Sequence, residues 1–319
     1  MPTHLILLVI QRFALGVLLL LASSVLIFAG TQILPGDVAQ AVLGQAATPE
    51  AIANLREEMG LNEPAVSRYL SWLLGALQGD FGTALTNGAD IGSAIAKRLS
   101  NTLFLAFWAA LVSVPLAILL GLIAVRFRNR WPDRLISAVS LATISVPEFV
   151  IGYLFMFFVA VKLRWVPSVS MLNDSMSLGQ KLQSIALPVI VLTFVVLAHM
   201  MRMTRATILN VMEAPYIETA ELKGLSRFAV ISRHALPNAV APIVNVVMLN
   251  LAYLVVGVVV VEVIFVYPGM GQYLVDHVAK RDIPVVQAAG LIFASVYILL
   301  NMTADIIGIV ANPRLRHPK

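Results

Sequence analysis

The stretch Thr102–Val125 reads TLFLAFWAALVSVPLAILLGLIAV and contains no charged residue. A helix needs about 20 mainly apolar residues to cross the hydrocarbon core of a bilayer, so this stretch predicts a membrane-spanning helix. Five further stretches pass the same test, and we therefore expect an all-α integral membrane protein with six transmembrane helices. The other approximate ranges are Phe13–Ile33, Leu135–Val161, Ile185–Met201, Ala241–Phe265 and Val285–Val310.

The composition also indicates a membrane protein. Of the 319 residues, 59% are hydrophobic and only 12% are charged, whereas soluble domains carry about 25% charged residues. The mean hydropathy is +0.88. The absence of cysteine excludes a disulfide framework and a thiolate metal site, and the five histidines show no pair at ligand spacing. The net charge of +5 requires no nucleic-acid partner, because membrane proteins concentrate Lys and Arg in cytoplasmic loops.

The distribution of basic residues predicts the orientation. One set of connecting segments holds thirteen of the 22 Lys and Arg residues against four acids, and the opposite set holds nine against ten acids. The positive-inside rule therefore places both termini in the cytoplasm, in agreement with an even number of spans. The first apolar stretch exceeds the core of a signal peptide, which is about 7–15 residues long, and we interpret it as an uncleaved helix. Cleavage is the alternative.

These spans divide the chain into three regions: a transmembrane helix over 1–34, an extracytoplasmic helical domain over 35–101 and a five-helix core over 102–319. In the middle region Thr48 suits a helix N-cap and Pro49 the first helical position, with Glu50 at the positive end of the helix dipole. Gly60 suits the C′ position of this helix.

A second extracytoplasmic helix is expected from Pro64 to about Leu77. Its apolar residues form one stripe: Val66, Tyr69, Leu70, Leu73 and Leu77. The stripe could lie on the membrane surface or pack on the helix bundle. A packed cap and a docking or gating surface both remain open as its role.

The segment between the fourth and fifth spans is the most informative, and over 213–242 it reads EAPYIETAELKGLSRFAVISRHALPNAVAP. The cytoplasmic loop is expected over 206–237. Pro215 suits the start of a short helix that Gly224 closes. Ser226 then caps another short helix, which we expect Pro237 to break before the fifth span. Two brief charged helices cannot bury much surface in their own chain, so this segment is expected to insert into another protein.

This loop resembles the EAA loop of ABC importer permeases. The shared pattern is E-x-A-x3-G-x9-H-x-L-P, formed by Glu218, Ala220, Gly224, His234, Leu236 and Pro237. The family consensus reads E-A-A-x3-G-x9-I-x-L-P, so Thr219 and His234 depart from it. Both departures are similar to the variant of the dipeptide, oligopeptide and nickel permease subfamily.

Blocks along nearly the whole chain carry the same resemblance. They are LPGDVAQAVLGQAATPEAIANLREEMGLNEPAVSRYLSWL, GDFGTAL, VVVEVIFVYPGMGQYLVDHVAKRDIPVVQA and NMTADIIGIVANPRLR. Asn312 stands where the subfamily usually has Asp, which puts any role of that carboxylate in doubt.

The resemblance implies a type I ABC importer permease fold in the bacterial inner membrane. It also implies that the loop is a coupling helix seated in a groove of an ATPase subunit. The coupling residues would be Glu218, Ala220, Glu221, Lys223, Gly224, His234, Leu236 and Pro237.

The implied partners are a second permease subunit that forms a heterodimer with this chain, two ATP-binding subunits and an extracytoplasmic solute-binding protein. No G-x-x-x-x-G-K-[ST] phosphate loop occurs in the chain. We therefore expect no cofactor on this chain, and ATP and Mg²⁺ at the partner subunits.

Three acids fall within or near the spans: Glu148, Glu262 and Asp305. A charge at the bilayer centre costs at least about 2.5–3.5 kcal/mol, so each acid should face protein or water. For Glu262 and Asp305 we favour structural pairing near the helix ends, with a solvated path as the alternative. Glu148 follows Pro147, and a kink there would suit a carboxylate lining the pathway as well as it suits a structural role.

Two other features are candidates for the pathway or its gate. Asn245 and Asn250 are expected first to form hydrogen bonds between helices and only second to line the pathway. The YPGMG segment, with Pro268, Gly269 and Gly271, has the composition of a tight extracytoplasmic turn. The resemblance makes it a candidate for the outer gate, and a turn without that role is the alternative.

Two other classes compete with a non-catalytic permease. A secondary transporter or channel subunit would work without an ATPase, but it would more often show internal repeats, and none is visible. A membrane-embedded enzyme would need a nucleophile, base or metal ligands at membrane depth, and none is visible. The solute stays open among dipeptides, oligopeptides, nickel chelates, glutathione and opine-like compounds.

Overall fold

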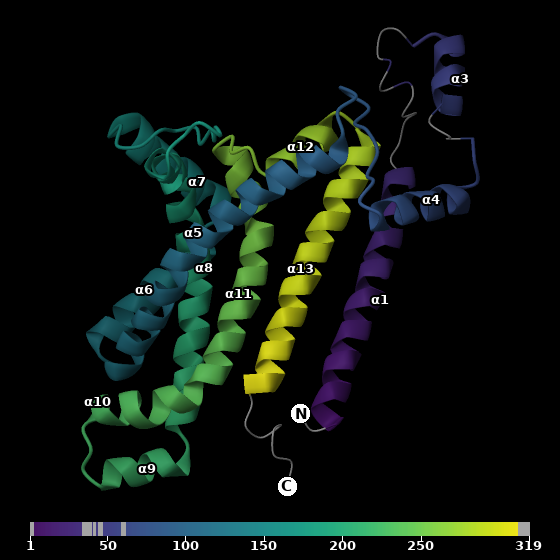
Figure 1. The fold of residues 1–319 in the computed structure, drawn as a ribbon. Helices are drawn as coiled ribbons and strands as arrows, with labels where there is room; N and C mark the ends of the chain where they lie inside the picture. Colours follow the sequence, from purple (N-terminus) through teal and green to yellow (C-terminus); the bar gives the residue numbers. More distant parts are fainter. Residues whose placement is uncertain (1–2, 34–39, 41–42, 44–46, 59–61, 312–319) are drawn as a thin grey trace. The chain divides into compact units, whose positions relative to one another are not determined.

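The fold was obtained as a computed structural model that describes residues 3–33, 40, 43, 47–58 and 62–311 (Figure 1). Within these residues the chain is helical, and its β pairing is an isolated bridge between Thr83 and Asp90. Gly60, Asn312 and the basic residues from 314 onward lie outside the described residues. The helices are α1 (Thr3–Ile33), α3 (Pro49–Glu58), α4 (Ala65–Leu77), α5 (Ile91–Arg126), α6 (Trp131–Ser145), α7 (Glu148–Phe155), α8 (Leu178–Met212), α9 (Pro215–Leu222), α10 (Arg227–Val230), α11 (Leu236–Ile264), α12 (Met270–Ala279) and α13 (Ile283–Ala311), with π-helical turns η2 (Met156–Lys162) and η3 (Ile231–Ala235).

In the part of the chain that the structure describes, five long helices have the length and apolar composition of membrane spans. They cover Ile6–Ile33, Ile91–Arg126, Leu178–Met212, Arg227–Val255 and Ile283–Ile309. A sixth span exists if α6 and the α7–η2 segment count as one bent crossing. The prediction of an all-α membrane protein is therefore confirmed, and the predicted six spans are reached when the bent pair is counted as one span.

The third expected span, Leu135–Val161, is not one continuous helix. Its two halves meet at an angle of 100°. Val146 has φ −96° and ψ 127°, the extended conformation that a following proline favours. Pro147 also has no N–H to bond the carbonyl of residue 143, so α6 ends at Ser145 and α7 starts in a new direction at Glu148. The sequence indicated a kink here but not its size.

The fifth span differs from the expectation in the opposite way. Pro237 does not break the helix, because α10, η3 and α11 follow one another without interruption. The N–H of Leu236 bonds the carbonyl of Ile231, five residues earlier. Pro237 cannot donate a hydrogen bond, and a local i→i−5 turn lets the chain absorb the proline while remaining helical.

The chain forms two compact units. Unit 1 consists of residues 1–14, 103–267 and 299–319, and unit 2 consists of residues 15–102 and 268–298. The core of unit 1 lies where α8 packs on α11, α6 and α7, with Leu187, Val191, Leu254 and Val258 fully or almost fully buried. Asn245 and Asn250 lie on α11, within unit 1.

Unit 2 has a smaller core of its own. Ile91 and Ile95 of α5, Met270 and Tyr273 of α12, and Val285 of α13 bury one another. The expected extracytoplasmic helices α3 and α4 also belong to this unit. The predicted N-cap of α3 is confirmed, since the Thr48 hydroxyl accepts a hydrogen bond from the Ala51 N–H at 3.2 Å.

Candidate functional site

The candidate site is built on α9, which follows α8 after a two-residue connection. Pro215 occupies the first turn of α9, where its missing N–H has no cost, and Glu218 lies near the positive end of the helix dipole. Figure 1 shows α9 and α10 beside each other at one end of α8 and α11.

A Schellman motif ends α9. Gly224 has φ +79°, its N–H bonds the carbonyl of Glu221 at 2.9 Å, and the Leu225 N–H bonds the carbonyl of Ala220 at 3.4 Å. This left-handed conformation suits glycine, because a Cβ there contacts the following carbonyl oxygen. A Cβ built on Gly224 would nevertheless meet no atom of the chain within 4 Å. Within this chain the residue is needed for its φ angle and not for space.

One face of α9 is buried by its own chain. Ile217 and Ala220 pack in a small cluster with Val230 and Ala235. The α9–α10 element therefore buries more in its own chain than the sequence led us to expect, and the neighbour of Ala220 is this chain's own α10–η3 segment. The element is a preformed unit of structure.

The opposite face of α9 is exposed. Glu218, Glu221 and Lys223 all point to the surface, and Leu222 is 82% exposed. Phe228 of α10 is 63% exposed. Leu222 lies outside the candidate spans, and Phe228 is the second residue of the candidate span Arg227–Val255. Exposed apolar side chains gathered in this way are consistent with a protein-binding surface.

α10 is attached to the end of α5. The Ser226 hydroxyl caps α10 by accepting from the Ala229 N–H at 3.3 Å, as predicted. Nη2 of Arg227 lies 3.4 Å from the Val125 carbonyl oxygen, near the negative end of the α5 dipole. The guanidinium of Arg126 lies 5.4 Å from the ring centroid of Phe228. These contacts join α10 to a long helix other than those that flank it in sequence.

A buried cluster completes this attachment. Val125 of α5, Ile208 of α8, Ile231 of η3, and Ala239 and Ile243 of α11 pack together. The α9–α10 element is thus continuous with α8 and α11 and packed against α5. A displacement of the element would be transmitted to three long helices.

The remaining motif residues lie at the junction of η3 and α11. His234 is half-buried, and its carbonyl accepts from Nδ2 of Asn238 at 2.7 Å. Leu236 is half-buried against the cluster around Ile231, and Pro237 is exposed in the first turn of α11. These residues therefore shape the helix that leaves the candidate site.

An ion pair that the sequence did not reveal lies between α6 and α8. Nε and Nη2 of Arg205 donate to Oδ1 and Oδ2 of Asp133 at 2.8 and 2.9 Å. Oδ2 of Asp133 also accepts from the Asn129 N–H at 2.9 Å. The Asp133 side chain is only 5% exposed, against 27% for Arg205. Both residues are among the charges of the connecting segments that predict the orientation, and nothing in the local pattern pairs them.

Glu148, the first residue of α7, is half-buried beside α11. Its Oε2 lies 3.6 Å from the position of a Cβ on Gly257. Among the described residues it forms no hydrogen bond or ion pair. Glu262 is fully buried on α11, where its carbonyl accepts from the Tyr267 N–H at 2.8 Å.

The two asparagines of α11 differ in their surroundings. Asn250 is buried, and its Nδ2 donates to the Val246 carbonyl at 2.8 Å and lies 3.7 Å from Sδ of Met203 on α8. Oδ1 of Asn245 lies 3.5 Å from the position of a Cβ on Gly308 of α13. The Asn250 side chain is thus buried and hydrogen-bonded within the helix core, whereas the Asn245 side chain lies close to α13 near its C-terminal end.

Asp305 of α13 pairs with Arg12 of α1, with Nη1 to Oδ2 at 2.9 Å. The expectation of structural pairing is confirmed for this acid. The pair is partly exposed, since 48% of the Arg12 side chain and 40% of the Asp305 side chain are accessible.

The candidate gate residues lie in unit 2. The Pro268 carbonyl accepts from Nδ2 of Asn101 at 2.8 Å, and the Met270 N–H donates to Oγ1 of Thr102 at 2.8 Å. Gly269 precedes α12 as its N-cap, and Gly271 is buried within α12. The turn is therefore held against α5 by two hydrogen bonds.

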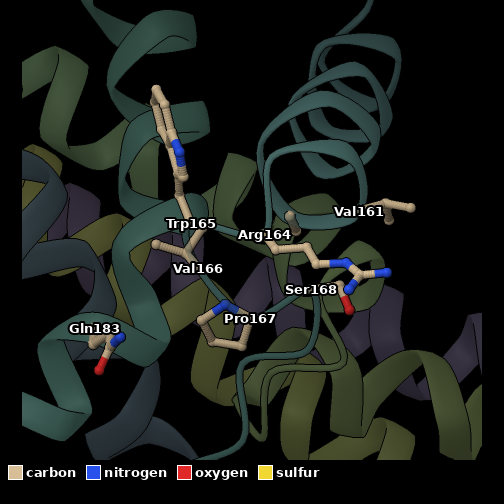
Figure 2. Close-up of a pocket in the computed structure, with 8 residues that line it drawn as sticks. Val161, Arg164, Trp165, Val166, Pro167, Ser168 and Gln183 are labelled. Carbon is tan, nitrogen blue, oxygen red and sulfur yellow. The ribbon is translucent and has the colours of Figure 1, made fainter.

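A hollow of about 540 Å³ lies in unit 1, between η2 and α8. Figure 2 shows Arg164, Trp165, Pro167 and Gln183 on its wall. The side chains of Arg164 and Trp165 point in different directions, and the hollow contains none of the predicted site residues. Its polar groups do not converge on a common point, as they do in a small-molecule site.

Comparisons with known proteins agree along the chain. The model of the family "binding-protein-dependent transport system inner membrane component" matches residues 113–317, and that of its N-terminal region matches residues 5–106. The probable peptide ABC transporter permease protein y4tP of Sinorhizobium fredii is 32% identical over 309 residues, 97% of this chain and 99% of the relative.

Two further relatives are glutathione transport system permease proteins GsiC. The one from Escherichia coli K12 is 36% identical over 294 residues, 92% of this chain and 94% of the relative. The one from Salmonella typhimurium is 36% identical over 298 residues, 93% and 95% of the two chains. A solved structure, the MetNI methionine ABC transporter in inward-facing conformations, matches with a TM-score of 0.49 at 18% identity, over 69% of this chain and 95% of that chain.

Proposed function

This chain belongs to the family of binding-protein-dependent transport system inner membrane components, and we propose that it takes up peptides or related small solutes as half of an ATP-driven translocation pathway. It is a multi-pass inner-membrane permease subunit of an ABC importer. The solute class is proposed because the relatives that cover almost the whole chain are named for peptide and glutathione transport.

The coupling role of α9 is the centre of the proposal. Its exposed face would sit in a groove of the ATPase subunit, with Leu222 and Phe228 as apolar anchors and Glu218 and Glu221 facing basic groups. The observation that supports it best is the combination of an exposed face with a rigid attachment to α5, α8 and α11. ATPase closure would move α9 as a rigid body and turn the membrane helices with it.

The proposed assembly has four kinds of component. This chain pairs with a sister permease, two ATP-binding subunits hold ATP and Mg²⁺, and an extracytoplasmic protein delivers the solute. The chain itself is non-catalytic and has both termini in the cytoplasm. The absence of a phosphate-loop motif from the sequence supports placing the nucleotide on the partners.

Glu148 is our first candidate for the pathway. A carboxylate at a bend between membrane helices cannot face lipid without a large cost. It is half-exposed in the single subunit and has no partner among the described residues, which favours a water-filled path or the sister subunit. Glu262, Asn245, Asn250, Pro268, Gly269 and Gly271 are secondary candidates for the pathway or its gate.

The proposal is tested in liposomes that contain either the complete complex or this chain alone. We expect ATP-dependent uptake only with the complete complex, and we expect Gly224→Asp to abolish uptake and solute-stimulated ATP hydrolysis at normal abundance. Normal stimulated hydrolysis by Gly224→Asp would contradict the coupling role. Uptake by this chain alone would favour a secondary transporter or channel.

A further inference from the structure

Unit 2 contains a cavity of about 300 Å³ between α1, α4 and α13. It is lined by Val17, Leu20, Leu21 and Ser24 of α1, by Leu73, Ala76 and Leu77 of α4, by Phe81, and by Leu291, Ile292 and Ser295 of α13. No predicted site residue lies in it. Its size is at the lower end of the range of small-molecule pockets.

Neither serine in the wall has a free hydroxyl hydrogen to donate. Oγ of Ser24 donates to the Leu21 carbonyl at 2.8 Å, and it lies 2.9 Å from the Tyr69 hydroxyl, which must then be the donor. Oγ of Ser295 donates to the Leu291 carbonyl at 2.7 Å. The rest of the wall is apolar, so a ligand group that accepts hydrogen bonds would lose its bonds to water here without replacement. The wall therefore selects a hydrocarbon.

The position of the cavity along α1 gives its depth. Beyond the cavity, the ring of Phe28 of α1 contacts Tyr69 edge-on and Trp72 at a tilt, both on α4, at centroid distances of 5.4 and 6.0 Å. Aromatic side chains of this kind mark the interface between lipid and water. Further along, Oε1 of Gln32 accepts from Nη2 of Arg68 at 2.7 Å. Leu20 lies about 18 Å below Gln32, at 1.5 Å per residue, so the cavity lies at hydrocarbon depth.

The cavity is continuous with apolar surface. Leu77 both lines it and ends an exposed row on α4 that also contains Val66, Leu70 and Leu74. This row is about a quarter turn away from the side of α4 that packs on α1. An amphipathic helix with such a face lies in the plane of the membrane interface.

We propose that this cavity binds one acyl chain of a membrane phospholipid, with α4 lying over it in the interface. This goes beyond the transport role and does not depend on coupling to an ATPase. The alternative occupant of the same apolar wall is a helix of the sister permease, and the experiment separates the two.

The test uses the assembled transporter in nanodiscs of phosphatidylethanolamine and phosphatidylglycerol, with a trace of phosphatidylethanolamine that carries a diazirine in the middle of one acyl chain. After illumination, peptide mass spectrometry locates the adducts. We expect adducts on Leu73 and on Leu291–Ser295. Ala76→Trp, which fills the cavity, should lower the α13 adducts about tenfold, equivalent to about 1.4 kcal/mol of binding.

Leu74→Trp is the matched control, because Leu74 is exposed on the same helix and does not line the cavity. It should leave the α13 adducts unchanged. If Ala76→Trp lowers the melting temperature of the complex, Ala76→Leu replaces it as the cavity-filling variant, because leucine fills less space. Absence of adducts in the cavity, equal labelling in Ala76→Trp, or adducts that appear only when the sister permease is removed would each overturn the proposal.

Discussion

Arg205 of α8 forms a bidentate ion pair with Asp133 of α6, with Nε to Oδ1 at 2.8 Å and Nη2 to Oδ2 at 2.9 Å. α8 continues through a two-residue connection into α9, and α6 leads to the bend at Pro147. The pair therefore connects the proposed coupling helix with the bent segment that carries Glu148.

Asp133→Asn should destabilise unit 1 strongly. The substitution removes the charge of the buried Asp133 and leaves the Arg205 guanidinium, 27% exposed, without its counter-charge. Losing hydrogen bonds between charged groups costs about 1.5–3 kcal/mol. We expect a clear fall in the melting temperature of the purified chain and loss of uptake by the complex. Arg12→Gln is the control, because its partner Asp305 is partly exposed and such pairs contribute about 1 kcal/mol or less. Equal melting shifts in the two variants would contradict the assignment.

Gly224→Asn separates the backbone role of Gly224 from close approach of a partner. Asn tolerates a positive φ better than other side chains, whereas Gly224→Ala pays about 1–2 kcal/mol for the left-handed conformation. In this chain the added Cβ meets nothing. We expect Gly224→Asn to keep the melting temperature of the chain and to lose solute-stimulated ATP hydrolysis. Full stimulation in Gly224→Asn would show that the groove does not approach this residue closely.

Leu222→Ser should weaken ATPase binding and leave the permease stable. The side chain is 82% exposed, so the free chain loses almost no burial. Truncating an apolar anchor at an interface costs about 2 kcal/mol or more, which is more than a tenfold loss of affinity. Pull-down of the ATPase subunit by the permease measures this loss of affinity. Leu178→Ser, at the start of α8, is the exposed control, and an equal loss in that variant would assign the effect to general misfolding.

Pro147→Ala should open the 100° bend between α6 and α7. The alanine restores an N–H at residue 147 and removes the restriction on Val146, so helical hydrogen bonds across the break become possible. The chain has no cysteine, and spin labels at Val139→Cys and Leu154→Cys therefore report one distance. We expect this distance to lengthen and uptake to fall. An unchanged distance would mean that packing on α8 and α11 holds the bend without the proline.

Features determined by neighbours in the sequence were predicted well. Uncharged apolar runs identified the spans, since the bilayer requires about 20 such residues whatever they pack against. Pro215, Gly224 and Ser226 located the ends of α9 and the start of α10, because helix caps depend on residues within one turn. The predicted helix break at Pro237 was wrong, because a π turn before the proline lets the chain stay helical through it.

Only the tertiary structure decided which distant residues meet. Asp133 and Arg205 are 72 positions apart, and their pairing exists because α6 packs on α8. The same holds for the burial of Ala220 against Val230 and for the cavity between α1, α4 and α13. The pattern of apolar residues states that a helix has a face to bury. The pattern does not identify the helix against which that face packs, because this pairing depends on how whole helices pack in three dimensions.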